Sequence, residues 1–166
     1  MSTDQIQKYR NNGAVGALLD EYERAMADLK NLVASIEPQE LVAIVDDQTK
    51  DPDCRSIQSV LTHVVRSGFG YATYIRNKHG EALDFRARKT RKSTVEYVTD
   101  LEAVFDFTEQ SFALHPEIVL EAYEPEQKMR VRWGQLYDVE QLMEHAIVHI
   151  LRHRRQIERF LLKLRH

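Results

Sequence analysis

Apolar residues recur at steps of three and four through most of this 166-residue chain, the spacing that places them on one face of an α-helix. The repeat forms four long segments, which we expect to be helices joined by long connections. Ser56, Ser93 and Asp138 precede three of these segments and are suitable N-cap residues, because their side chains can accept a hydrogen bond from the first turn. The expected helices lie near residues 14–37, 56–78, 93–114 and 138–164.

These elements predict an all-α fold, an antiparallel four-helix bundle with long connections, built as one domain over residues 1–166. A chain of this length can bury about 70% of its unfolded surface without disulfides. The first helix should end at Glu37-Pro38, and a single turn is expected at residues 41–45. Residues 129–133 alternate between apolar and basic side chains, which predicts a short extended piece over one end of the bundle.

The last expected helix carries the main chemical signal. Its apolar stripe consists of Leu142, Ala146, Ile150, Ile157, Phe160, Leu161 and Leu164. His153 lies within the stripe, His149 lies at its border one turn away, and His145 lies just outside it. An unpaired imidazole in apolar surroundings costs a few kcal/mol, so each inward histidine needs a partner. Two hypotheses remain open: a metal ion shared by His149 and His153, or two core histidines bonded to other helices.

A third histidine, His63, lies on the second expected helix beside its main apolar face, on a strip that also contains Tyr71. It can therefore point inward as well. The small residues Ser67 and Gly68 would leave room beside it for a neighbouring helix or a ligand. The alternative to a metal ligand is a core histidine bonded to a tyrosine.

Composition and charge narrow the classes of function. The net charge of -3 provides no general attraction to nucleic acid or anionic membranes. No run approaches the roughly 18 apolar residues of a membrane span, and the first residues lack the apolar core of a secretion signal. Cys54 is the only cysteine, so no internal disulfide can form. We expect a cytoplasmic protein whose partners are neither nucleic acid nor membrane.

Two further features have both a structural and a functional interpretation. The basic run from Arg86 to Lys92 is either a solvated loop or an anion site for a phosphate or carboxylate of a substrate. Ile147, Val148, Leu151 and Leu162 lie among charged residues on the outer side of the last helix. A mixed face of this kind suits a partner subunit, and we expect a homodimer.

Two segments resemble motifs of the DinB/YfiT-like superfamily, and the resemblance spans most of the chain. They are Arg55-Ser-Ile-Gln-Ser-Val-Leu-Thr-His63 and His149-Ile-Leu-Arg-His153-Arg-Arg-Gln-Ile157. The resemblance implies a four-helix bundle in which His63, His149 and His153 hold a divalent metal ion, for which we expect zinc or nickel, and it also favours a homodimer. Arg155 replaces the glycine of the usual His-Arg-Gly-Gln motif, and His145 matches no ligand position.

The family contains thiol-dependent transferases and isomerases and metal-dependent hydrolases. The resemblance therefore implies a metal-dependent enzyme that activates a thiol or water, with a small-molecule substrate such as a low-molecular-weight thiol. Three imidazoles leave at least one coordination position open, as in catalytic sites. No carboxylate base is evident beside the ligands, and Gln156 and Tyr71 are the nearest groups expected to contact them. The alternative is a non-catalytic metal-binding or stress-associated scaffold protein.

Overall fold

A computed structural model describes residues 9–166 of the chain. Its four long helices are α1 (Gly13–Ala34), α3 (Ile57–Lys78), α4 (Thr94–Leu114) and α5 (Val139–Arg165). The described residues are mostly helical with little sheet, as expected for the all-α class. Residues 1–8, in which we expected no apolar core of a secretion signal, lie outside the described residues.

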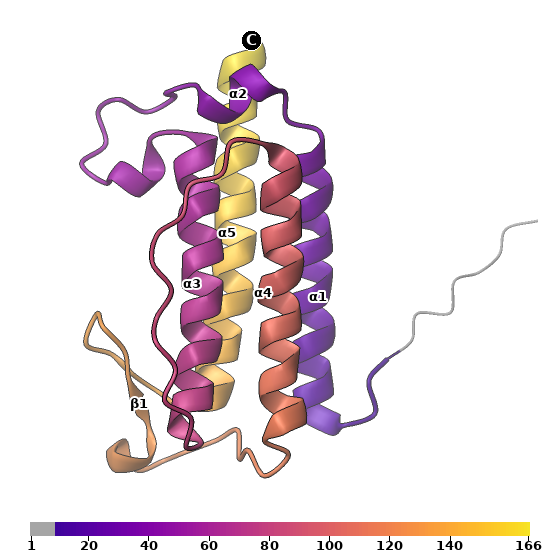
Figure 1. Ribbon diagram of the computed structural model, residues 1–166, viewed down its shortest axis with the longest axis vertical. Helices are drawn as coiled ribbons and strands as arrows, with labels where there is room; N and C mark the ends of the chain where they lie inside the picture. The colour runs from indigo at the N-terminus through magenta and orange to yellow at the C-terminus, as the bar shows by residue number, and fades with distance from the viewer. Residues whose placement is uncertain (1–8) are drawn as a thin grey trace, which may run out of the picture.

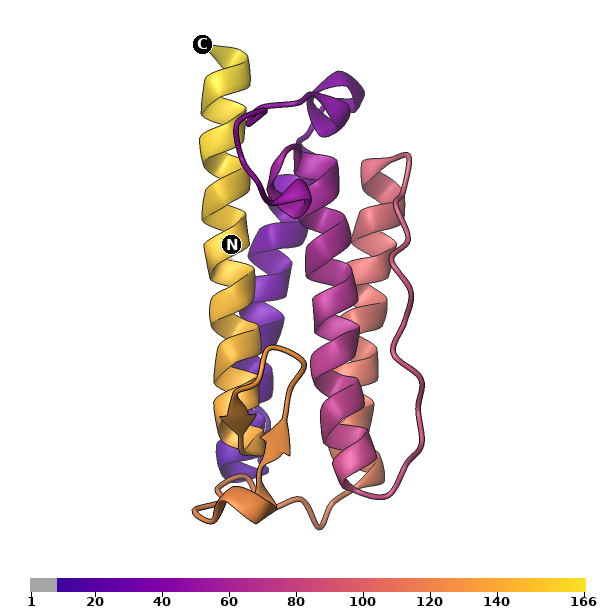
Figure 2. The ribbon, with the colours of Figure 1, turned by 90° about the vertical axis from the view of Figure 1, so that its left-hand side faces the viewer.

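The long helices lie side by side, with α1 and α5 running one way and α3 and α4 the other (Figures 1 and 2). Both α1 and α3 pack against α4 and α5. We expected antiparallel neighbours throughout, but two of the packed pairs are parallel, α3 with α4 and α1 with α5 (Figures 1 and 2). The pair α3 and α4 is parallel because residues 79–93 return along the outside of the molecule before α4 begins (Figure 2). This 15-residue connection can reach about 50 Å when extended, more than the roughly 33 Å length of the 22-residue helix α3.

The helix starts agree with the predicted caps. The side chains of Ser56, Ser93 and Asp138 each accept a hydrogen bond from the backbone three residues later, and a side chain at that position bonds back. The first helix is shorter than predicted, since it ends at Ala34. Pro38 instead starts a short helix, α2 (Pro38–Val42), because its fixed φ suits a first turn. The turn expected at residues 41–45 therefore lies a few residues earlier.

The core lies between the four long helices, and Leu29, Leu61, Leu101 and Ile150 are buried there, one from each helix. The predicted stripe of α5 is buried except for Leu164, which is 36% exposed. The last turns of α5 extend beyond the ends of α3 and α4, which explains this exposure (Figure 2). Along residues 9–166, no helix combines the length and apolar character needed to cross a membrane.

Two connections cover the side on which α3 and α5 pack. The segment before α3 contains a short 3-10 helix, η1 (Pro52–Cys54), and a second one, η2 (Pro125–Gln127), precedes a hairpin. The hairpin pairs β1 (Met129–Arg130) with β2 (Leu136–Tyr137). The extended piece was predicted, but its partner strand was not. The Tyr74 hydroxyl accepts a hydrogen bond of 2.9 Å from the backbone of Arg132, which ties the hairpin to α3.

Candidate metal centre

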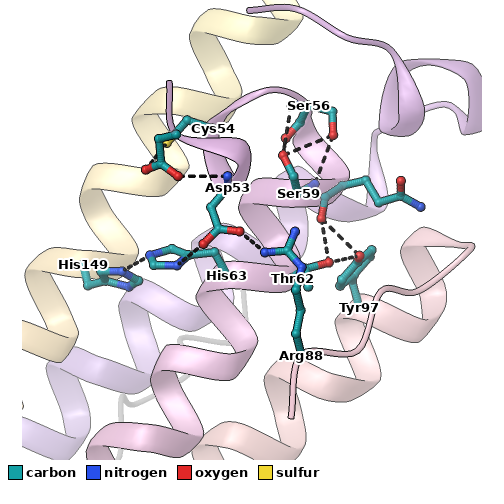
Figure 3. Close-up of polar contacts among 11 residues, drawn as sticks. Asp53, Cys54, Ser56, Ser59, Thr62, His63, Arg88, Tyr97 and His149 are labelled. Atoms are coloured by element: carbon teal, nitrogen blue, oxygen red, sulfur yellow. Dashed lines mark hydrogen bonds and ion pairs between the residues drawn. The ribbon is translucent and has the colours of Figure 1, made fainter. Parts of the chain in front are cut away.

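The antiparallel packing of α3 and α5 brings three histidines together. His63 comes from the first half of α3, and His149 and His153 lie one turn apart on α5. One ring nitrogen of each residue lies within 4.8 Å of the other two. The Nε2 atoms of His63 and His149 are 2.9 Å apart (Figure 3). The structure thus assembles the three residues singled out in the sequence, whereas His145 does not belong to this group.

Burial keeps the three imidazoles neutral. It lowers the pKa of His149 to about 2, and the neighbouring rings of His153 and His63 act in the same direction. It also lowers the pKa of His153 to about 4 and shifts that of His63 below its usual value. Near neutral pH each ring therefore has a nitrogen lone pair that can bind a metal ion.

Two of the three rings have a partner that orients them. The Nδ1 atom of His153 donates a hydrogen bond of 2.8 Å to Oε1 of Gln156. The Nδ1 atom of His63 lies 3.4 Å from Oδ2 of Asp53, which also forms an ion pair with Arg88 (Figure 3). A proton on Nδ1 leaves the lone pair on Nε2, the usual arrangement behind a metal-binding imidazole.

The donor set fits a divalent cation. The Nε2 atoms of His63 and His149 share a hydrogen bond of 2.9 Å, and Nδ1 of His149 is buried without a hydrogen-bond partner among residues 9–166. A cation bound to Nε2 of both rings would replace this shared hydrogen bond. Nitrogen ligands at about 2.0–2.1 Å from one ion lie at most about 4.2 Å apart, so small ring rotations would let all three share it. Neutral nitrogen donors of this kind suit zinc and nickel.

The three histidines lie in the wall of a cavity of about 510 Å³. Tyr71, Trp133 and His145 line the same cavity, and the edge of Tyr71 packs against His149 with ring centroids 5.6 Å apart. His145 stacks on Trp133 with ring centroids 5.5 Å apart. The predicted contacts of Gln156 and Tyr71 with the ligands are therefore present, and His145 contributes to the cavity wall.

The sequence did not point to Asp53 as a partner of His63. Asp53 lies in the irregular segment before α3, where no periodicity indicates which way a side chain faces. The only local signal is Asp51-Pro52, which starts the turn of η1, and the Asp51 side chain accepts a hydrogen bond from the backbone of Asp53. The contact with α3 depends on tertiary folding of this segment.

Comparisons with known proteins give no independent assignment. No family model matches the chain, and no match was found among curated proteins.

Proposed function

We propose that this chain is a DinB/YfiT-like four-helix bundle in which His63, His149 and His153 hold one divalent ion, zinc or nickel, in a metal-dependent enzyme of the thiol S-transferase or hydrolase type. The observation that carries the proposal is the convergence of three neutral imidazoles in the wall of a cavity. The cavity is of the size that small-molecule substrates occupy in proteins, which supports a catalytic over a closed structural site.

A divalent ion with an open coordination position lowers the pKa of a bound water or thiol, which makes either one a nucleophile near neutral pH. The chain itself supplies the orientation of the ligands. Gln156 accepts a hydrogen bond from His153, and a carboxylate oxygen of Asp53 lies 3.4 Å from Nδ1 of His63. Both contacts help to orient the rings as ligands.

His145 is the residue best placed to accept the proton that the nucleophile loses. The Tyr137 hydroxyl donates to Oε1 of Gln135 at 2.6 Å, so its oxygen is left to accept from Nδ1 of His145 at 3.2 Å. This arrangement leaves the Nε2 lone pair of His145 free. The ring lines the cavity 6.2 Å from the ring of His149, measured between centroids.

We also propose that the protein is a homodimer. Val148, Leu151 and Leu162 lie on one side of α5, and all three are exposed in the single chain. A second copy of this face would cover them symmetrically.

The metal proposal is tested by measuring metal content and affinity in untagged protein. We expect one zinc or nickel ion per chain, and replacement of His63, His149 or His153 with alanine should abolish tight binding. His145→Ala on the same helix is the matched control and should retain the ion. Asp53→Asn and Gln156→Leu should weaken binding by about 10- to 100-fold, because they remove the partners of the ligands.

Catalysis is tested by assaying the metal-loaded protein with low-molecular-weight thiols and electrophiles and with hydrolysable esters and amides. Chelation should abolish turnover, and added zinc or nickel should restore it. His145→Ala should bind metal normally but turn over slowly. Loss of the ion in His145→Ala together with its retention in His153→Ala would refute the ligand assignment. Tight metal binding without turnover would instead favour a non-catalytic scaffold.

A further inference from the structure

Four arginines surround the cavity beside the three histidines. They are Arg66, Arg86, Arg132 and Arg152. Each comes from a different segment: α3, the connection at residues 79–93, the turn of the hairpin, and α5. Segments far apart in the sequence therefore deliver positive charge to one cavity.

None of these four guanidinium groups forms an ion pair with a carboxylate within residues 9–166. Seven other arginines do form such pairs: Arg10, Arg24, Arg76, Arg88, Arg91, Arg154 and Arg165. Two aspartates, Asp51 and Asp53, also line the cavity, but Asp53 already contacts Arg88 and His63. The cavity thus has an excess of positive charge, which attracts anions.

Two of the four arginines are held in place by aromatic rings. The Cζ atom of Arg86 lies 3.4 Å from the centroid of Phe69, and that of Arg132 lies 4.4 Å from the centroid of Phe85. A guanidinium stacked on a ring keeps its N–H edge available for two parallel hydrogen bonds to a carboxylate or phosphate. Holding the group in this way reduces the entropy lost when an anion binds.

The same cavity offers apolar surface next to the charges. Tyr71, Phe85 and Trp133 line it, and its volume of about 510 Å³ lies within the range of small-molecule sites. This combination selects a small molecule that carries both an anionic group and an apolar part.

We propose that the cavity binds a small organic anion, with its carboxylate or phosphate group held by Arg66, Arg86, Arg132 and Arg152 and its apolar part against Tyr71 and Trp133. Its role as substrate rests on the proposed function, whereas its binding does not. The arginines of the basic run at residues 86–92 then have different roles. Arg86 lines the cavity and binds the anion, while Arg88 and Arg91 form ion pairs with Asp53 and Asp100.

Trp133 is the only tryptophan of the chain and lines the cavity, so its fluorescence can report binding. Succinate, inorganic phosphate and the neutral analogue succinamide are titrated at constant ionic strength. The titrations use zinc-loaded protein and protein stripped of metal and dialysed free of chelator. Succinate or phosphate should give a saturable change in both forms, and succinamide should give none. Tighter binding of succinate supports a carboxylate as the recognised group, and tighter binding of phosphate supports a phosphoryl group.

Substitutions test whether the arginines are responsible. Arg66→Gln, Arg86→Gln, Arg132→Gln and Arg152→Gln should each weaken anion binding by about tenfold or more, because each removes a charge-assisted hydrogen bond. Arg159→Gln, on the exposed surface of α5 outside the cavity lining, is the matched control and should change the affinity by less than about twofold.

The outcomes separate this proposal from the metal centre. Saturable binding in metal-free His153→Ala protein would support the anion site whether or not the metal proposal holds. Binding that requires zinc and does not respond to the four substitutions would overturn the anion site and leave the metal centre standing. An absence of saturation, or an equal response to succinamide, would also overturn it.

Discussion

His115 follows the last residue of α4 and lies between two carboxylates, with Nε2 2.7 Å from Glu81 and Nδ1 3.2 Å from Glu117. The hydrogen bond to Glu81 raises the pKa of His115, and Glu117 acts in the same direction. Arg76 in turn lowers the pKa of Glu81, and His115 contributes to that shift. Histidine thus has a raised pKa at this end of the molecule, where a carboxylate accepts its hydrogen bond, and lowered pKa values in the three-histidine cluster, where burial disfavours the charged ring.

The shift at His115 predicts how stability depends on pH. A raised folded-state pKa means that the contribution of His115 is fully present below its unfolded value of 6.5 and is lost as pH rises through the folded value. The free energy of unfolding, measured in urea, should therefore fall more steeply above pH 6.5 in the wild type than in His115→Gln. His166→Gln, exposed at the C-terminal end, should keep the wild-type slope; an unchanged slope in His115→Gln would contradict the prediction.

Single residues differ in how far the sequence could place them. His153 in the apolar stripe and His149 at its border could be expected to face inward side by side, since helical geometry fixes their relative direction, whereas their role as ligands was an expectation from the family resemblance. Asp53 and Arg132 could not be assigned, because they lie in irregular segments whose position depends on tertiary contacts.

Among the elements, α3 and α4 approach each other closely at Gly68. A Cβ atom at this position would lie 2.5 Å from Cγ1 of Val104 on α4. The space that the sequence indicated beside His63 is therefore occupied by a neighbouring helix. Gly70, two residues later on the same helix, lines the cavity, and a Cβ atom added there would meet no neighbouring side chain within 4 Å.

This pair of glycines predicts opposite effects of one substitution. Gly68→Ala should lower the free energy of unfolding by about 1–3 kcal/mol, because Val104 has little freedom to move away. Gly70→Ala should raise it by about 0.5–1 kcal/mol, since alanine loses less backbone entropy in a helix. Urea denaturation of both variants checks the prediction, and a change of the same sign in both would count against it.

The helix starts could be predicted because capping is local: Ser93 and Glu96, for example, exchange hydrogen bonds within one turn. The parallel orientation of α3 and α4 could not be predicted from the sequence. It depends on the return path of residues 79–93, which have no apolar repeat. The partner strand of the hairpin escaped prediction for a similar reason, since residues 136–137 are too short to show an alternating pattern.

At the scale of the whole molecule, the exposed apolar side of α5 bears on assembly. Val148 is 60% exposed, Leu151 41% and Leu162 60%, and Arg155 and Glu158 lie among them on the same side of the helix. Charged residues between apolar ones offer a second copy both hydrophobic contact and groups of opposite charge for ion pairs.

Light scattering at micromolar concentration should therefore report twice the chain mass of 19.4 kDa. Leu151→Glu combined with Leu162→Glu should shift the protein to the monomer, because two carboxylates would be buried in the interface. Leu114→Glu, which also replaces an exposed leucine but lies at the end of α4, is the control and should leave the dimer intact. A wild-type monomer under these conditions would rule out the dimer.

The separation of 86 residues between His63 and His149 has a consequence for how the protein is made. At about 5–20 residues per second, the ribosome needs roughly 4–17 s to pass from one to the other. During that interval α1, α3 and α4 can begin to collapse, but α5 is not yet available to cover them or to complete the proposed ligand set. Loading with metal is thus expected late in biogenesis, after synthesis of α5. A nascent chain arrested before that helix would carry only His63 of the three proposed ligands.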